Sequence, residues 1–488
     1  MEWVIANMAP LMFGALVLFL LFGYPVAFAL AANGIVFGLL GIELGLLQPA
    51  LFQALPERIF GIMGNDTLLA IPFFTFMGLI LERSGMAEDL LDTIGQLFGP
   101  MRGGLAYAVI FVGALLAATT GVVAASVISM GLISLPIMLR YGYDKRLASG
   151  VIAASGTLAQ IIPPSLVLII MADQLGKSVG DMYEGAFIPG LTLTALYVGY
   201  VFLVSLVRPA ACPALPPEAR TVHGIKLLLR VLTTLLPPLI LIFLVLGTIF
   251  LGIATPTEGG AMGATGALIL AVARKRLSFK LLKQAMETTG KLTSFVVFIL
   301  VGSTVFGLVF RGVNGDLWVE HLLLSLPGGQ LGFLIVVNIL VFLLAFFLDF
   351  FELSFIIVPL LAPVADKLGI DLIWFGVLLA VNMQTSFMHP PFGFALFYLR
   401  SVAPAAVKTT DIYWGAIPFV CIQIIMVAIV ISFPGIVSYG DPAERARIEQ
   451  SDGSDLGALM QQGGMSGDSP EQKDPAADLL KNLQQNEK

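Results

Sequence analysis

The chain has 488 residues, of which 58% are hydrophobic and 12% are charged, and its formal net charge is −6 at pH 7. Because soluble proteins carry about 25% charged residues, this composition excludes a soluble globular domain and predicts a protein that lies mostly within a bilayer. No basic residue precedes the first apolar run, which follows Glu2, so we expect that run to remain in the mature protein rather than be cleaved as a signal.

Crossing a bilayer takes about twenty apolar residues, and apolar runs of this kind recur along the chain. We expect spans over 4–21, 24–42, 66–82, 148–172, 186–207, 233–252, 258–273, 291–310, 372–399 and 413–436. Two more apolar segments, 105–136 and 331–363, are too long for one straight span, and each is interrupted in the middle. Each either crosses twice or enters halfway and returns as a re-entrant hairpin, which is the assumption we adopt. The expected fold class is an all-α integral membrane protein.

The basic residues support this division of the chain. With both hairpins re-entrant, 17 Lys and Arg side chains fall on one face and 4 on the other. Since cytoplasmic loops carry the excess of basic residues, the first face is cytoplasmic, and the N-terminus and tail lie outside. The basic stretch 274–291 is expected to form an amphipathic helix on the inner surface, either as a static clamp or as a mobile linker.

The tail over 437–488 is polar, with ten acidic and five basic side chains, and we expect it to be disordered. Cys212 and Cys421 are far apart in the sequence, so a disulfide framework is not indicated.

The chain resembles itself. A broken apolar segment, a short polar loop, a span with a Pro-Pro pair and a further proline-containing span follow one another twice. Pro163 lies 26 residues before Pro189, and Pro390 lies 28 residues before Pro418. Five spans separate the hairpins, an odd number, so the second copy is inverted, as in many secondary transporters.

The predicted domains follow from this repeat. They are N-terminal scaffold spans over 1–64, a first repeat over 65–207, scaffold spans and the cytoplasmic arm over 208–290, a second repeat over 291–436, and the tail over 437–488.

Each Pro-Pro pair breaks a span, because proline removes a backbone donor and clashes with the preceding turn. Broken backbone at membrane depth is tolerated where it lines a cavity or binds a ligand. Polar residues next to each break offer oxygen ligands for an alkali cation, and a helix that starts at the break suits a carboxylate. The candidates are Ser155, Gly156, Thr157, Pro163 and Pro164 in one copy, and Asn382, Gln384, Thr385, Ser386, His389, Pro390 and Pro391 in the other.

The hairpin tips add further candidates. They are Thr119, Thr120, Gly121 and Ser126 at the first tip, and Asp349, Glu352 and Ser354 at the second. Carboxylates at membrane depth are costly and commonly functional, although Asp349 and Glu352 could equally cap their own helix ends. Thr255 and Glu258, beside Pro256, are expected to cap a helix.

Several motifs of enzymes and pumps are missing from the sequence. It contains no phosphate-binding loop, no HExxH and no CxxC, and its three histidines are widely spaced. We therefore expect no catalytic residues and no tightly bound cofactor, so an ion gradient must drive any uphill movement.

The runs NDTLLAIPFFTFMGLILERSGMAEDLL (65–91), RYGYDKRLASGVIAASGTLAQIIPPS (140–165), GAFIPGL (185–191), ATPTEGGA (254–261) and MHPPFGFALFYLRSVAP (388–404) together resemble the DctM family. Its members are large membrane subunits of tripartite ATP-independent periplasmic (TRAP) transporters, and the resemblance covers about 1–436. It implies an elevator-type fold in a bacterial inner membrane and sodium-coupled uptake of an organic acid. It implies two partners, a small four-span subunit (DctQ-like) and a periplasmic solute-binding protein (DctP-like). Only about 64 residues precede the first motif, so the small subunit should be a separate chain.

The same resemblance implies sodium sites around Thr120–Ser126 with Ser155, Gly156 and Thr157, and around Asp349–Ser354 with Gln384, Thr385 and Ser386. The bulky second tip, FLDFFELS, and His389 before the second Pro-Pro pair resemble a subgroup that handles 2-oxo acids or related carboxylates. Two alternatives remain at this point: a stand-alone ion-coupled carboxylate symporter, and a membrane-embedded enzyme or channel.

Overall fold

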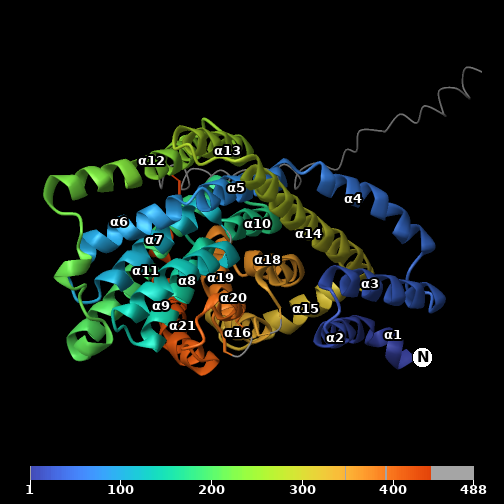
Figure 1. Cartoon of the computed structure of the whole chain (residues 1–488). Helices are drawn as coiled ribbons and strands as arrows, with labels where there is room; N and C mark the ends of the chain where they lie inside the picture. The colour runs from blue at the N-terminus through green and yellow to red at the C-terminus, as the bar shows by residue number, and fades with distance from the viewer. Residues whose placement is uncertain (1, 122, 347, 391–392, 441–488) are drawn as a thin grey trace, which may run out of the picture. The chain divides into compact units, whose positions relative to one another are not determined.

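The computed structural model describes residues 2–121, 123–346, 348–390 and 393–440. The chain divides into a body over Met1–Ser438 and a second unit over Tyr439–Lys488. Every regular element in the described ranges is helical and belongs to the body (Figure 1). The predicted tail lies outside the described residues from 441 onward.

The first half of the body carries eleven α-helices and two 3-10 turns in the described ranges. They are α1 (Glu2–Ala6), α2 (Met8–Leu21), α3 (Val26–Glu43), η1 (Pro49–Ala54), α4 (Leu55–Met63), α5 (Asp66–Arg83), α6 (Met86–Phe98), α7 (Gly104–Thr120), α8 (Val123–Arg140), α9 (Lys145–Thr157), η2 (Leu158–Gln160), α10 (Leu166–Leu175) and α11 (Val179–Val207).

The second half begins with two short turns and ends with another. Its elements are η3 (Pro209–Ala211), η4 (Pro217–Ala219), α12 (Gly224–Phe250), α13 (Pro256–Ala273), α14 (Phe279–Gly312), α15 (Gly315–Leu324), α16 (Gly329–Leu344), α17 (Phe350–Glu352), the π-helical turn η5 (Leu353–Ile357), α18 (Val358–Lys367), α19 (Leu372–Met383), η6 (Gln384–Phe387), α20 (Phe394–Val402), α21 (Thr409–Ser432) and η7 (Pro434–Ile436).

Capping residues explain where several of these helices start. The side chains of Asn65, Asp144, Ser165 and Asp371 accept main-chain N–H groups at the starts of α5, α9, α10 and α19. Such caps satisfy donors that a helix start otherwise leaves unpaired. At α13, the Thr255 hydroxyl and the Glu258 carboxylate form a capping box, which confirms the role predicted for this pair.

Six described helices are long and apolar enough to cross a membrane, namely α3, α8, α11, α12, α14 and α21. The number reaches eight if two bent pairs, η1–α4 with α5 and α15 with α16, each count as one span. The two predicted Pro-Pro spans are built from shorter pieces, α9 with α10 and α19 with α20. These helices make the chain a multi-pass membrane protein.

One predicted boundary is wrong. Residues 279–291 of the expected surface helix and the span over 291–310 form one continuous 34-residue helix, α14, and residues 274–278 precede it. No proline interrupts Phe279–Gly312, so nothing in the sequence stops the helix between the basic and apolar parts. At 1.5 Å per residue it is about 50 Å long, which exceeds the ~30 Å hydrocarbon core. Helices α4, α6 and α15 were not predicted.

The order of elements repeats, and so does their packing. Helix α13 packs along α5, and α3 packs along α14; α21 lies on α9, and α11 lies on α19 (Figure 1). The short helix after each break reaches the hairpin of the other copy, since α10 contacts η5 and α18, and α20 contacts α8. Such reciprocal contacts are what a two-fold relation between the copies produces.

Polar contacts join segments that the charge count assigns to the same face. Arg230 pairs with Asp92 at 2.6 Å, and Arg276 with Asp89 at 3.0 Å, all on the predicted cytoplasmic face. On the other face, Lys367 pairs with Glu320 at 2.6 Å. These partly exposed pairs contribute little free energy, but their partners agree with the predicted sidedness.

Candidate substrate and ion site

A cavity of about 330 Å³ lies where both hairpin tips meet both breaks. We call it the tip cavity. Its described lining residues are Gly121, Val123 and Ala124 from the first tip, Gln160, Leu166 and Val167 from the first break, Asp349, Phe350 and Phe351 from the second tip, Phe387, Phe394 and Tyr398 around the second break, and Leu292 and Phe295 from α14. The structure therefore brings together the four pieces that the sequence singled out.

The Ser165 side chain satisfies backbone groups on both sides of the first break. The Ser165 hydroxyl donates to the Gln160 carbonyl oxygen at 2.6 Å and accepts the Val167 N–H at 3.2 Å. It thus satisfies one carbonyl freed at the break and caps α10, while Pro163 and Pro164, joined by a cis bond, lie between. The Gln160 side-chain oxygen is buried without a hydrogen-bond partner in the described part of the chain.

The first tip sits directly on this break. Gly121 adopts φ +58°, and a Cβ there would lie 3.2 Å from Leu166 Cγ and 3.5 Å from Leu166 N. Glycine tolerates this conformation and lets the tip backbone approach the start of α10. The side chains of Thr119 and Thr120 lie outside the described residues, and Ser126 is buried.

The second tip is capped by its own carboxylates. Asp349 Oδ1 accepts the Glu352 N–H at 3.0 Å, and Glu352 Oε2 accepts the Asp349 N–H at 2.9 Å. The capping alternative is therefore satisfied, yet Asp349 also lines the tip cavity. Ser354 points elsewhere, with its hydroxyl 3.6 Å from the Met171 sulfur and 3.8 Å from the Met383 sulfur.

The two breaks are linked through the predicted ion ligands. Gln384 Nε2 donates to the Thr157 carbonyl oxygen at 2.8 Å and to its hydroxyl oxygen at 3.3 Å. The hydroxyls of Ser155, Thr157, Thr385 and Ser386 all donate to carbonyls three or four residues earlier, at 2.6 to 2.8 Å. The hydroxyl oxygens of Ser155, Thr385 and Ser386 therefore keep lone pairs for another donor or a cation. The Thr157 hydroxyl oxygen already accepts N–H groups from the Gln384 and Gln423 amides.

Glycines allow the hairpin helices to pack onto the first broken span. A Cβ on Gly156 would lie 2.3 Å from Val127 Cγ2 of α8, and one on Gly113 of α7 would lie 2.5 Å from Ser155 Cβ. Both hairpin helices therefore touch α9 beside the predicted ion ligands.

Two predicted site residues contact the second hairpin instead of lining the tip cavity. Asn382 Nδ2 donates to the carbonyl and side-chain oxygens of Asn338 on α16, at 2.8 and 2.9 Å. The His389 ring lies 4.2 Å from the Phe342 ring and 4.4 Å from the Phe346 ring, measured between centroids. Pro390 follows His389 at the break, and Pro391 lies outside the described residues.

Comparison with known proteins identifies the family to which this chain belongs. Residues 13–436 match the family model described as "Tripartite ATP-independent periplasmic transporter, DctM component". The chain belongs to this family.

Three curated relatives illustrate the similarity. The C4-dicarboxylate TRAP transporter large permease protein DctM of Vibrio cholerae is 30% identical over 86% of this chain and 94% of that protein. The protein of the same name from Pseudomonas aeruginosa is 29% identical over 80% and 90%. The sialic acid TRAP transporter permease protein SiaT of Haemophilus influenzae is 26% identical over 79% and 62%. This chain is thus a TRAP transporter large permease subunit.

A solved structure shares the fold at low identity. The YdaH transporter of Alcanivorax borkumensis superposes with a TM-score of 0.56 at 14% identity, covering 79% of this chain and 88% of that one. The likeness supports a helical transporter fold for the permease.

Two residues near the breaks were missed from the sequence. Gln423 Nε2 on α21 donates to the Tyr197 hydroxyl of α11 at 2.9 Å and to Thr157 Oγ1 at 3.4 Å. The side-chain oxygens of Gln384 and Gln423 are buried and have no hydrogen-bond partner among the described residues. A lone amide in the apolar run PFVCIQIIMVAIV was the available signal, because polar side chains in a span are commonly functional.

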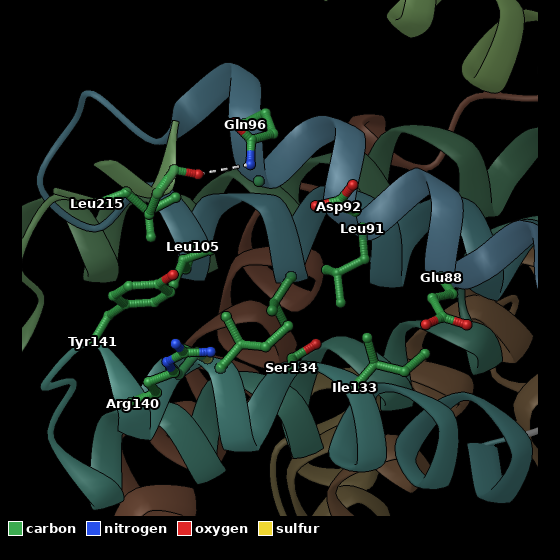
Figure 2. Close-up of a pocket in the computed structure, with 15 residues that line it drawn as sticks. Glu88, Leu91, Asp92, Gln96, Leu105, Ile133, Ser134, Arg140, Tyr141 and Leu215 are labelled. Atoms are coloured by element: carbon green, nitrogen blue, oxygen red, sulfur yellow. Dashed lines mark hydrogen bonds between the residues drawn. The ribbon is translucent and has the colours of Figure 1, made fainter. Parts of the chain in front are cut away.

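The permease has a second cavity of about 300 Å³ between α6 and α8. Figure 2 shows Glu88 and Asp92 on α6 across from Ile133, Ser134 and Arg140 on α8, with the Gln96 amide bonded to the Ala219 carbonyl. Neither hairpin tip nor either break contributes a described lining residue. The tip cavity is therefore the better candidate for the substrate.

Proposed function

We propose that this large permease subunit takes up a small carboxylate by sodium-coupled secondary transport, with the substrate in the tip cavity. The observation that carries the proposal is the convergence of both hairpin tips and both breaks on one cavity. Proteins commonly place substrate and coupling-ion sites at such repeat interfaces built from discontinuous helices.

Two helix starts favour an anionic substrate. The first residues of α10, Leu166 and Val167, and the first residue of α20, Phe394, line the tip cavity. The positive ends of helix dipoles and free N–H groups at a helix start stabilise a carboxylate. The side chain of Gln160 lies in the same wall, and its amide N–H can donate a hydrogen bond to a carboxylate.

The charge balance favours a coupled cation. The described lining residues include the carboxyl of Asp349 and no Lys or Arg. An anionic substrate beside Asp349 would meet a like charge at membrane depth, so a cation bound nearby lowers the cost of substrate binding. The cluster of Thr157, Gln384 and Gln423 offers buried oxygens for sodium, including two amide oxygens without a described partner.

Transport is proposed to follow an elevator mechanism. The bond from Gln384 to Thr157 ties the broken spans together, and α7 and α8 pack on α9. These pieces would move as one body, while α3, α5, α13 and α14 pack against one another as a framework. A separate small membrane subunit and a periplasmic solute-binding protein would complete the transporter in the bacterial inner membrane.

The test is uptake by proteoliposomes that contain the full chain, with the proposed small membrane subunit and solute-binding protein supplied as separate proteins. Accumulation of a labelled carboxylate should require an inward sodium gradient and the binding protein. Equal uptake with potassium in place of sodium would contradict the coupling. Uptake that persists without the binding protein would favour a stand-alone symporter.

A further inference from the structure

The two copies of the repeat contribute different chemistry to the tip cavity. The described lining residues of the first copy are small or aliphatic apart from the Gln160 amide. Among the described residues, the aromatic rings that line the cavity all come from 291–436, and they are Phe295, Phe350, Phe351, Phe387, Phe394 and Tyr398. The first copy therefore supplies a wall of small and aliphatic residues with one amide, and the second copy supplies a wall of aromatic rings, which we call the aromatic wall.

Five of these rings form two groups. The Phe351 ring lies 5.7 Å from the Phe295 ring at 89° and 5.2 Å from the Phe350 ring, measured between centroids. The Phe387 and Phe394 rings lie 5.9 Å apart. The edge-to-face arrangement of Phe295 and Phe351 is favourable between aromatic groups, and the lining rings present an apolar face to whatever fills the cavity.

A dicarboxylate fits this arrangement poorly. One carboxylate can bind at the start of α10, next to Gln160 and the Gly121 tip. A second carboxylate would lie against the rings and near Asp349, the one charged side chain among the described lining residues. Burying a charge without a partner is costly, whereas burying an apolar group against rings is favourable.

We propose that the substrate is a monocarboxylate that carries an apolar group, with the carboxylate at the first break and the apolar group against the aromatic wall. This assignment rests on the proposed function of the tip cavity. It distinguishes the permease from its relatives named for C4-dicarboxylates.

The experiment measures ligand binding to the full-length protein in lipid nanodiscs with sodium chloride. Acetate, butanoate, hexanoate and 3-phenylpropanoate form a series of rising apolar size, and succinate is the dicarboxylate. Thermal unfolding followed by intrinsic fluorescence at several concentrations gives the dissociation constant of each ligand. We expect affinity to rise by about fourfold for each buried methylene, with succinate binding no more tightly than acetate.

A matched pair of variants locates the effect. Phe295 and Phe298 lie on the same helix and are 46% and 48% exposed, but only Phe295 lines the cavity, while Phe298 packs against Phe28. Phe295→Ala should weaken the dependence on chain length, and Phe298→Ala should preserve it. If the two variants change the dependence of affinity on chain length equally, the proposal is overturned. The longer ligands would then gain affinity by general partitioning into the lipid or onto the protein surface, and not by contact with the aromatic wall.

The outcomes separate this proposal from the proposed function. Tighter binding of succinate than of the longer monocarboxylates would overturn the apolar substrate class and leave a carboxylate transporter. The absence of any ligand-dependent stabilisation by either class would overturn the tip cavity as a carboxylate site, and the substrate class with it.

Discussion

Gln384 donates a hydrogen bond of 2.8 Å to the carbonyl oxygen of Thr157, and both residues stand six positions before the first proline of their own Pro-Pro pair. They are therefore equivalent residues of the two repeats, and the hydrogen bond joins one repeat to the other. The bond supplies a side-chain donor to a carbonyl beside the first break, where α9 ends and the 3-10 turn η2 begins.

Replacement of Gln384 by Leu removes this donor without changing the side-chain length greatly. The Thr157 carbonyl then stays buried without its partner, which costs about 1–3 kcal/mol. We expect a lower thermal unfolding midpoint in nanodiscs and reduced uptake. We expect the same loss for Gln384→Glu when its side chain is a carboxylate, because a carboxylate cannot donate a hydrogen bond to the Thr157 carbonyl. A Leu variant as stable as the unaltered protein would show that the two breaks are not coupled through this amide.

Thr157→Val and Thr385→Val test the proposed ion site. Each change removes a buried hydroxyl oxygen while preserving shape, so the sodium concentration for half-maximal uptake should rise roughly tenfold, the effect of losing ~1.5 kcal/mol at a charged group. Thr192→Val is the control, since the Thr192 hydroxyl also donates to a carbonyl of its own helix, that of Ile188, but Thr192 is only half-buried and lies on α11 outside the proposed ion site. Unchanged sodium dependence in both test variants would remove the ion-site assignment.

Much of this site follows from local signals. Pro163, Pro164 and Pro390 predict breaks because proline removes a backbone donor and clashes with the preceding turn, although α12 continues through Pro237 and Pro238. Polar residues beside such breaks predict a site because membrane interiors do not tolerate them otherwise. The capping box at Thr255 and Glu258 likewise needs only neighbouring residues.

Other features depend on tertiary contacts and were missed. Tyr197 and Gln423 meet at Thr157 only because α11 and α21 cross there, and the sequence carries no sign of that crossing. The partners of Asn382 and His389 on α16 were unpredictable for the same reason. The continuity of α14 was missed because a change from basic to apolar residues alters hydropathy without stopping a helix.

Gly156→Ala tests the close packing of the first hairpin on α9. The new Cβ would lie 2.3 Å from Val127 Cγ2, and overpacking of this kind costs about 1–3 kcal/mol. We expect a lower unfolding midpoint and loss of uptake, both partly restored by adding Val127→Ala. Gly307→Ala is the control, because that Cβ meets nothing within 4 Å and should leave stability unchanged or slightly higher. Failure of Val127→Ala to restore stability would place the defect elsewhere.

Asp349 can act as a helix cap, as a charged wall of the tip cavity, or as both, and two substitutions separate these roles. Asn caps helices about as well as Asp, so Asp349→Asn should keep the unfolding midpoint while it removes the charge. Asp349→Ala removes both and should cost about 1 kcal/mol more. If the charge balances the coupling cation, sodium-driven uptake falls sharply in both variants, although only the Ala variant loses stability. Glu258→Gln removes the charge from the capping box of α13, outside the cavity, and should transport normally. Normal uptake by Asp349→Asn would leave Asp349 with the structural role alone, and the cation would then need another counter-charge.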